Sequence, residues 1–560
     1  MSKKISGQEY DAWSKEELVK EIVKIKSTTY GLVWHRDLPE EKIDILVNPD
    51  ARTPNEMFPN EMAGKPFPVL KEVKGKAIES DKSKLVNLLI EGDNYHSLAV
   101  LNFTHHEAVD LIYIDPPYNT GNNDFIYNDK FVDREDSFRH SKWLSFMEKR
   151  IKLSKNLLKR NGVIFISIDD NEQAPLKLLC DEIFGETNFY GCLTWFKRTK
   201  STNSGKAKKM LQQKVEYILV YGKETTEDFN GFKLLYSGIK KQYPHIGKFG
   251  KCRFENLEAT DYGRKKRDTM KFEILGITPR IGRRWQIGKD TADKLVSEEK
   301  IELVDGFPMR AVYPEDEEGE SFIPFWSHLE ETGSAETGKV ELSDVIGPEH
   351  GFDTVKPISL IKLLLNRFEN DVTVLDFFAG SGTTGHAVLQ QNKEDGGLRK
   401  FILCTNNENN ICTDICYPRV KKVISGYKNQ KGEKIDGLGG NLKYYKTDFV
   451  EAESTDKNKR KLVKESTDML CILENAFELI QETPEFKIFK NTDKYVGVIF
   501  YEEAIEDYKK AIKKIDGHFN TYVFSMGDDP HAKKFADVKN KVSLCAIPEV
   551  ILKVYREIFK

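Results

Sequence analysis

Short apolar runs, each closed by a turn signal, recur along the chain. Residues 109–114 (VDLIYI), 163–168 (VIFISI) and 400–405 (KFILCT) are rich in β-branched and aromatic side chains. Runs of this length and composition predict buried strands. A helical pattern from about Ser141 to Lys159 separates the first two runs. Apolar strands that alternate with helices predict an α/β fold, built on a doubly wound and mostly parallel sheet.

The first of these strands ends abruptly at Asp115, Pro116, Pro117 and Tyr118. Prolines cannot extend the ladder of a sheet, so the end of the strand forms a rigid ledge. Ligands of open α/β sheets bind at that end of the strands. The Asp115 carboxylate and the Pro116 carbonyl can accept both hydrogens of an exocyclic base amine, and Tyr118 offers a ring on which an extruded base stacks. The other interpretation is a proline turn with a structural tyrosine.

A second strand leads into a glycine turn at residues 372–384 (VTVLDFFAGSGTT). Gly380 and Gly382 allow the backbone to turn tightly and to approach a ligand. Thr383 or Thr384 is expected to cap the helix that follows, whose free N–H groups favour a carboxylate or a phosphate. The lysine of a phosphate-binding GxxxxGK[ST] loop is absent, which argues against nucleotide hydrolysis.

The two segments together resemble the signature motifs of the S-adenosylmethionine-dependent DNA amino-methyltransferases. Residues 90–98 (IEGDNYHSL) resemble the family segment whose aspartate, Asp93 here, binds the adenine amino group of the methyl donor. Residues 354–357 (TVKP), with Lys356, resemble the segment that shapes the donor's methionine pocket. The order of the motifs is that of the β group. Within it, the run DPPYNTG is most similar to the modification (Mod) subunits of type III restriction-modification systems, and the resemblance spans about residues 85–449.

The resemblance implies a Rossmann-like methyltransferase sheet and transfer of a methyl group from S-adenosylmethionine to adenine N6 in DNA. It implies that Asp115, Pro116, Pro117 and Tyr118 are catalytic. The implied donor-binding residues, with Glu408 on the donor's ribose, are Asp93, Lys356, Asp376, Phe378, Gly380, Gly382, Thr383 and Glu408. Asp rather than Ser at the first motif position favours adenine over the N4 of cytosine. A catalytically inactive DNA-specificity module, or methylation of RNA or of a protein amide, stays open as an alternative.

Composition predicts several domains in a soluble globular protein, since 560 residues exceed the usual limit of one core and 31% of them are charged. We expect an N-terminal helical segment and connecting arm, a catalytic half of the methyltransferase domain, a target-recognition region, a cofactor-binding half and a small C-terminal α/β domain. Their expected bounds are 1–75, 76–223, 224–343, 344–450 and 451–560. Residues 455–461 (TDKNKRK) are expected to form a charged linker.

Several classes of protein are disfavoured by the sequence. No apolar run approaches the ~18 residues of a membrane span, and residues 1–6 have no apolar core behind them, so we expect a cytoplasmic protein without a membrane partner. The eight cysteines include no CxxC pair, and no metal site is predicted. No helicase or nuclease motif is visible, so cleavage would need a separate restriction (helicase-nuclease) subunit. The resemblance also implies a homodimer.

Positive charge is concentrated between the two main motifs. Residues 190–290 hold 23 Lys and Arg against 10 Asp and Glu, a surplus of 13 in a chain of net charge −3. Trp195, Phe196, Tyr262 and Trp285 are interleaved with the basic runs. A charge run can be a solvated face, but this combination favours double-stranded DNA. The candidate contacts are Lys197, Arg198, Lys206, Lys208, Lys209, Arg264, Lys265, Lys266, Arg267, Arg283 and Arg284.

Overall fold

The computed structural model of the chain consists of two compact units, residues 1–231 with 326–560 and residues 232–325. Each is described by itself. The structure describes residues 14–16, 18–19, 34, 43, 45, 47–51, 53, 56 and 64–555, with gaps at 81–84, 122–125, 128–129, 132–137, 202–210, 225–231, 233–234, 237–241, 262–266, 317–321, 324, 330, 353, 492–493, 526–530, 549–550 and 553.

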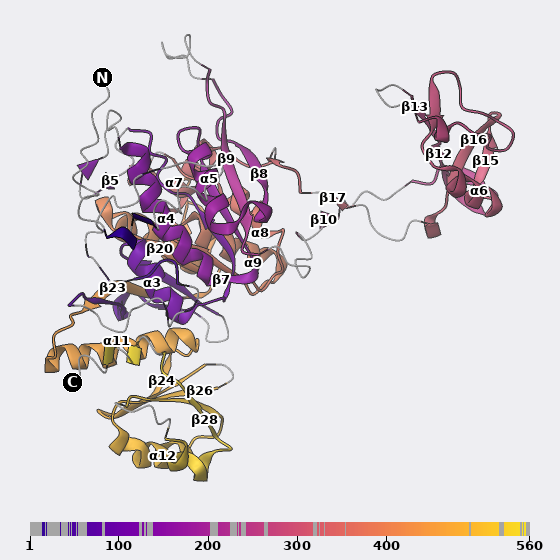
Figure 1. The fold of residues 1–560 in the computed structure, drawn as a ribbon. Helices are drawn as coiled ribbons and strands as arrows, with labels where there is room; N and C mark the ends of the chain where they lie inside the picture. Colours follow the sequence, from indigo (N-terminus) through magenta and orange to yellow (C-terminus); the bar gives the residue numbers. More distant parts are fainter. Residues whose placement is uncertain are drawn as a thin grey trace. The chain divides into compact units, whose positions relative to one another are not determined.

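The larger unit is built on an eleven-stranded sheet with a parallel centre (Figure 1). The strand order is β1-β23-β3-β20-β19-β4-β7-β9-β8-β18, and β2 pairs with β23. All pairs from β23 to β7 are parallel, whereas β1, β9 and β8 pair antiparallel with their inner neighbours. The strands are β1 (Phe67–Glu72), β2 (Ile78–Glu79), β3 (Val86–Glu91), β4 (Val109–Ile114), β7 (Leu158–Ile168), β8 (Phe189–Phe196), β9 (Val215–Gly222), β18 (His328–Leu329), β19 (Thr373–Asp376), β20 (Lys400–Thr405) and β23 (Asn441–Val450). The predicted α/β fold with a mostly parallel sheet is confirmed.

Helices flank the sheet in two packed groups, as a doubly wound sheet requires. Helices α3, α4 and α5 pack in sequence against one another, and α7, α8, α9 and α10 form the second group. In α4 the buried residues Trp143, Met147 and Ile151 recur every fourth position and form one apolar face. The helices are α3 (Asn94–Thr104), α4 (Arg139–Leu157), α5 (Gln173–Phe184), α7 (Ala335–Ile346), α8 (Ile358–Leu365), α9 (Thr383–Asp395) and α10 (Tyr417–Ser425).

The order of the strands places a crevice between β4 and β19. These two strands are neighbours, with Val374 opposite Leu111. From β4 the chain crosses to β7 on one side, and from β19 it crosses to β20 on the other. This reversal is a topological switch point, where ligands bind beyond the carboxyl ends of the strands. Asp115 follows β4 and the glycine turn follows β19, so both predicted motifs lie at this point.

Two predictions about the flanks of the sheet are wrong. Residues 67–72, expected in a connecting arm, form the edge strand β1, where Pro68 is tolerated because an edge strand leaves part of its ladder unpaired. Residues 455–461 are not a linker, because α11 (Asp456–Leu473) begins there. Thr455 caps this helix by accepting a hydrogen bond from the Asn458 N–H at 3.2 Å. Most of the expected N-terminal helical segment lies outside the described residues.

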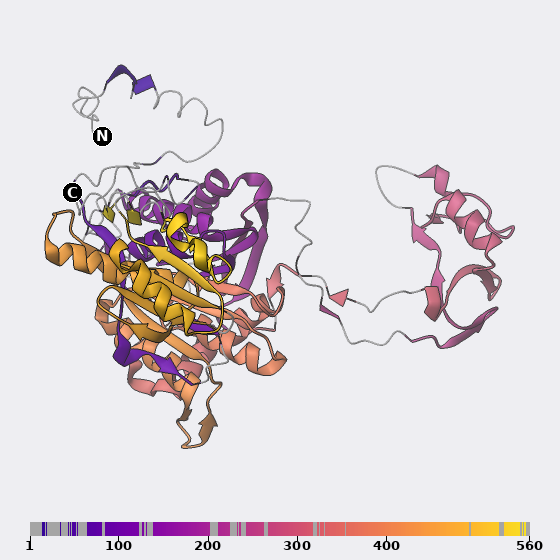
Figure 2. The ribbon, with the colours of Figure 1, turned by 90° about the horizontal axis from the view of Figure 1, so that it is seen from below.

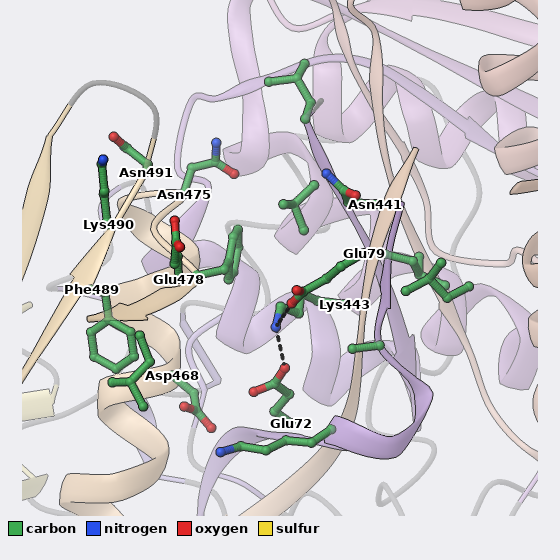
Figure 3. Close-up of a pocket in the computed structure, with 18 of the residues that line it drawn as sticks. Glu72, Glu79, Asn441, Lys443, Asp468, Asn475, Glu478, Phe489, Lys490 and Asn491 are labelled. Atoms are coloured by element: carbon green, nitrogen blue, oxygen red, sulfur yellow. Dashed lines mark hydrogen bonds and ion pairs between the residues drawn. The ribbon is translucent and has the colours of Figure 1, made fainter. Parts of the chain in front are cut away.

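The C-terminal part of the larger unit has its own five-stranded sheet. Its order is β24-β25-β26-β27-β28, and helix α12 (Ile505–Lys513) lies along it (Figures 1 and 2). The strands are β24 (Glu478–Glu482), β25 (Phe486–Lys490), β26 (Tyr495–Ile499), β27 (Phe519–Val523) and β28 (Val542–Cys545). Between this sheet and the β2–β23 edge lies a cavity of about 610 Å³ (Figure 3). Lys443 points across it and pairs with Glu72 at 2.9 Å, and no predicted site residue lines it.

The smaller unit is centred on an antiparallel sheet of order β11-β12-β16-β15. Helix α6 (Lys289–Ser297) buries Ala292 and Leu295 in the core of this unit, together with Trp285 and Ile301. Its strands include β11 (His245–Gly247), β12 (Gly250–Asn256), β13 (Glu258–Thr260), β14 (Arg283–Trp285), β15 (Ile301–Val304) and β16 (Phe307–Val312). The unit occupies the middle of the expected target-recognition region, whereas β18 and α7 at the end of that region belong to the larger unit.

Gly338 of α7 packs against the segment that carries Lys356, so a substitution there tests how this segment is positioned. A Cβ at Gly338 of α7 would lie 2.3 Å from the carbonyl oxygen of Val355. Alanine alone favours a helix over glycine by about 1 kcal/mol, but this backbone clash is expected to outweigh that gain. We expect Gly338→Ala to lower the free energy of unfolding in urea by roughly 1–3 kcal/mol. Gly75→Ala, where the added Cβ meets open space, is the control; a Gly338→Ala protein more stable than wild type would contradict the packing.

Candidate active site

Asp115 is bound by a lysine from a distant segment. Lys356 Nζ donates to both carboxylate oxygens of Asp115 at 2.8 Å and to the Tyr118 hydroxyl oxygen at 2.8 Å. The Tyr118 hydroxyl in turn donates to Asp115 Oδ1 at 2.7 Å. The Asp115 side chain keeps 31% of its exposure, whereas Lys356 keeps 10%. Lys356, expected in the donor's methionine pocket, therefore has its ammonium on the catalytic motif.

A second carboxylate, Glu216 of β9, balances the charge of this group. Lys356 Nζ lies 3.2 Å from Glu216 Oε2, Lys197 donates to Glu216 Oε1, and the Tyr118 hydroxyl is 3.1 Å from Glu216. Two ammonium groups and two carboxylates then form a cluster with no net charge, which we call the ion cluster (Asp115, Glu216, Lys197 and Lys356). The sequence reasoning missed Glu216, although an acid within an otherwise apolar strand was a usable signal.

Burial and charge act in opposite directions in the ion cluster. Burial would raise the pKa of Glu216, but the Lys356 and Lys197 charges outweigh it and hold that pKa below its ordinary value. Burial would lower the pKa of Lys356, and the carboxylates Asp115 and Glu216 raise it instead. For Tyr118, burial and the same carboxylates both raise the pKa of the hydroxyl. Lys356 therefore carries its charge, and the Tyr118 hydroxyl is neutral.

Aromatic rings enclose the ammonium of Lys356. Its Nζ lies 5.2 Å from the centre of the Tyr118 ring and 5.3 Å from that of Trp195, distances that allow cation–π attraction. Trp195 is fully buried and donates its indole N–H to the Gly333 carbonyl at 2.9 Å. The prediction that Trp195 belongs to a DNA-facing aromatic run is therefore wrong, because this ring is a wall of the ion cluster.

Side chains of α4 and of Glu172, the residue before α5, hold the proline ledge. The Trp143 indole donates to the Pro117 carbonyl at 2.7 Å. Asn119 is buried with a positive φ of 55°, a conformation that asparagine tolerates well. Its side-chain amide donates to Glu172 at 2.5 Å, and His140 Nδ1 lies 2.6 Å from the same carboxylate. The ledge is thus held on both sides of Tyr118.

The predicted glycine turn follows β19. Gly380 and Gly382 have positive φ angles of 48° and 77°, as their residue type allows. Gly382 is the N-cap of α9 without a side-chain cap, so capping by Thr383 or Thr384 is wrong. Thr383 instead accepts a hydrogen bond from the buried Arg419 at 2.7 Å, and Thr384 donates to Asp376 at 2.5 Å.

The space beside the glycine turn shows whether a methyl donor can fit there. A Cβ added at Gly380 would meet nothing closer than 3.7 Å, the distance to Phe352 Cζ. Phe378 packs against Phe377 and Phe146, with ring centres 5.2 and 6.0 Å away. The residues present therefore fit a donor that lies across the carboxyl ends of the strands.

Asp93 reaches the same region from the end of β3. It caps α3 by accepting from the Tyr95 N–H at 2.7 Å, and Arg150 donates to it at 3.0 Å. Burial would raise the pKa of Asp93, but the charges of Arg150 and His96 keep it below its ordinary value. Arg150 also donates to Asn94 at 2.5 Å, and Asn94 donates to the Phe377 carbonyl at 2.8 Å. This chain of contacts, which sequence reasoning missed, ties Asp93 to the glycine turn.

The remaining predicted donor residue, Glu408, is exposed in a short 3-10 helix (Glu408–Asn410) beyond β20. The buried carboxylate near that edge is Glu91, at the end of β3. It accepts a hydrogen bond from Tyr444 and pairs with Lys446 at 2.7 Å. These contacts engage Glu91 with β23, and a ribose contact by Glu408 stays a prediction.

The candidate DNA contacts lie in both units. Lys197 belongs to the ion cluster, since its ammonium binds Glu216, and the neighbouring Arg198 is exposed. Arg267, exposed, and the half-buried Arg283 and Arg284 are in the smaller unit. Trp285 is fully buried, so its predicted place on a DNA surface is wrong. The predicted contacts outside the described residues are Lys206, Lys208, Lys209, Arg264, Lys265 and Lys266.

The described part of the chain shows neither a metal site nor a membrane-spanning helix. No three His, Cys, Asp or Glu side chains there are grouped so that they could hold a metal ion. None of the helices there combines the length and apolar character needed to cross a membrane.

Comparison with known proteins finds relatives that cover this region. The family model described as DNA methylase, for N6/N4 methyltransferases, matches residues 109–416. The chain is 37% identical over 346 residues to the type III restriction-modification enzyme StyLTI Mod subunit of Salmonella typhimurium, covering 57% of this chain and 52% of that one. It is 31% identical to the type II methyltransferase M.KpnI of Klebsiella pneumoniae, covering 64% and 90%, and 31% identical to the EcoPI Mod subunit of Escherichia phage P1, covering 61% of each. The match thus spans about half to three fifths of these Mod subunits.

Asp376 predicts a pH dependence of stability. Burial raises its pKa from an ordinary 3.8 to about 7. The unfolded carboxyl ionises first, so stability from this group is full below about pH 4 and is lost as pH rises through 7. We expect Asp376→Asn to remove this loss. The free energy of unfolding in urea of the variant, minus that of wild type, should therefore increase by roughly 1 kcal/mol per pH unit between pH 4 and 7. Parallel curves for the two proteins would contradict the buried, neutral carboxyl.

Proposed function

The chain belongs to the DNA methylase family, and from this premise we propose that it transfers a methyl group from S-adenosylmethionine to adenine N6 at specific sites in double-stranded DNA. The observation that carries the proposal is the position of Asp115. Its carboxylate follows β4 at the switch point, beside the glycine turn that follows β19.

Asp115 keeps the capacity to accept an amino hydrogen. A carboxylate offers about four acceptor positions, and Lys356 and Tyr118 occupy three of them, two on Oδ1 and one on Oδ2. The remaining position on Oδ2 is proposed to accept one hydrogen of the adenine amine. The Pro116 carbonyl is proposed to accept the other, which directs the nitrogen lone pair away from the ring. Tyr118, fixed through its hydroxyl, offers its ring to the extruded base.

The donor is proposed to lie across the ends of β3, β19 and β20. Asp93 would hold its adenine amino group, the backbone at Gly380 and Gly382 would admit its methionine portion, and Asp376 and Phe378 would support the turn from below. When bound there, S-adenosylmethionine supplies an electrophilic methyl group. Glu408 is retained as the residue proposed for its ribose.

We further propose that the chain is the modification subunit of a type III-like restriction-modification system in the cytoplasm. Two relatives with 31–37% identity are named Mod subunits of type III enzymes. A homodimer and a separate helicase-nuclease subunit are the partners that this role would require. Adenine is favoured over cytosine by Asp115 at the first motif position and by these relatives.

The proposed role of Asp115 is tested by Asp115→Ala with radiolabelled donor and DNA. We expect the transfer rate to fall on the order of 10²–10³-fold, because a preorganised acceptor in the transition state is lost. Donor affinity measured by calorimetry should stay within about twofold, since the proposal places Asp115 against the target base and Asp93 and the glycine turn against the donor. Asp371→Ala, an exposed carboxylate ahead of β19, is the control.

The same assay identifies the product when the DNA is digested to nucleosides and the label is assigned by mass. The proposal requires label in N6-methyladenine from the wild-type protein. Label in N4-methylcytosine would reject the proposed base, and full activity of Asp115→Ala would reject the proposed site.

A further inference from the structure

A tight turn in the smaller unit presents an isoleucine to solvent. The Arg283 N–H donates to the Arg280 carbonyl at 2.9 Å, which closes a turn with Ile281 and Gly282 at its tip. Gly282 has a φ of 76°, the left-handed conformation that this turn position requires. Ile281 keeps 105% of its reference exposure. Turn tips are usually Gly, Pro, Asn, Asp or Ser, so a fully exposed β-branched apolar residue here needs an explanation.

The turn is rigid because a buried carboxylate holds its first residue. Glu258 accepts hydrogen bonds from the Arg280 backbone N–H and from Arg280 Nε, both at 2.7 Å, and its side chain has no exposure. The Arg280 guanidinium also lies 4.8 Å from the centre of the Phe307 ring. On the other side, Trp285 is buried and donates its indole N–H to the Phe272 carbonyl at 2.7 Å. Arg280 therefore has a structural role. Because the turn is already ordered, binding through its tip would not require further loss of conformational entropy in the turn.

The surroundings of Ile281 are basic. Arg283 and Arg284 follow directly on β14, and both keep intermediate exposure. A second apolar tip, Leu275, lies six residues earlier in the turn that Ile274 and Ile277 close through reciprocal backbone hydrogen bonds. Leu275 is 43% exposed and has a φ of 50°, which is unfavourable for leucine. Apolar tips beside guanidinium groups match the chemistry of duplex DNA, which has apolar base surfaces in its grooves between rows of phosphates.

We propose that Ile281 is an apolar DNA contact of the smaller unit. The turn enters a groove of the duplex, Ile281 packs against the bases, and Arg283 and Arg284 bind the flanking phosphates. Isoleucine is among the side chains that proteins insert between base steps, and apolar side chains also pack on the thymine methyl group. The inference rests on the proposed function, since it gives the target-recognition role to this unit and assigns the contact within it.

The test uses the full-length protein and its own recognition sequence. Sequencing of DNA that the wild-type protein has methylated defines that sequence, and fluorescence anisotropy then measures binding to a duplex that contains it. The variants are Ile281→Ser, the conservative Ile281→Val, and Ile246→Ser as the matched control. Ile246 is an isoleucine of the same unit with 82% exposure, on β11.

We expect Ile281→Ser to weaken binding about tenfold, because one apolar side chain no longer leaves water on binding. Ile281→Val and Ile246→Ser should bind as wild type does. The slope of log affinity against log salt should be unchanged for Ile281→Ser. Its magnitude should decrease by about 0.9 for Arg283→Ala and likewise for Arg284→Ala, since each of these variants removes a phosphate contact.

Two outcomes overturn the inference and leave the proposed function standing. One is wild-type affinity of Ile281→Ser for the duplex, which would show that the exposed tip makes no DNA contact. The other is an equal loss for Ile246→Ser, which would show that removal of any exposed apolar side chain from this unit weakens binding. Absence of any DNA methylation by the wild-type protein would overturn the proposed function, and this inference with it.

Discussion

The structure of the active site depends on the ion cluster of Asp115, Glu216, Lys197 and Lys356. Its members come from the end of β4, from β9, from the residue after β8 and from the segment ahead of α8, so four separate parts of the chain must meet for its charges to balance. Removal of one charge from such a group leaves another buried without a partner, which is more costly than the loss of the pair as a whole. The same contacts orient Asp115, whose free acceptor position the proposed chemistry requires.

Topology brings this cluster to the proposed donor site. Strand β4 ends in the rigid proline ledge and β19 ends in the glycine turn, and the two strands are paired at the switch point. The ledge requires a backbone with fixed φ angles, which prolines provide. The turn requires positive φ angles, which glycines allow. Arg150 links Asp93 to Asn94 and through it to the turn, so the proposed donor-binding groups are held in one network. A separate smaller unit carries the exposed basic turn with Ile281.

Local signals in the sequence predicted much of the fold and half of the site. The runs at 109–114 and 400–405 match β4 and β20 residue for residue, because apolar composition and the closing prolines or polar residues act within the segment itself. Glu216 was not assigned to the site because its partner Lys356 is over a hundred residues away in the chain, and Lys197 was missed with it because this lysine pairs with Glu216. Trp195 was misplaced for the same reason, since its burial depends on a contact with Gly333.

The most direct test of this account is a double-mutant cycle on Glu216 and Lys356, measured as the free energy of unfolding in urea. Glu216→Gln leaves one excess positive charge in the ion cluster, and Lys356→Met leaves one excess negative charge, so each is expected to cost about 3 kcal/mol. The double variant leaves Asp115 and Lys197, whose charges balance, and its cost is predicted to be well below the sum of the single costs. Additive costs, with no coupling between the two substitutions, would contradict a charge-balanced cluster as the basis of the site.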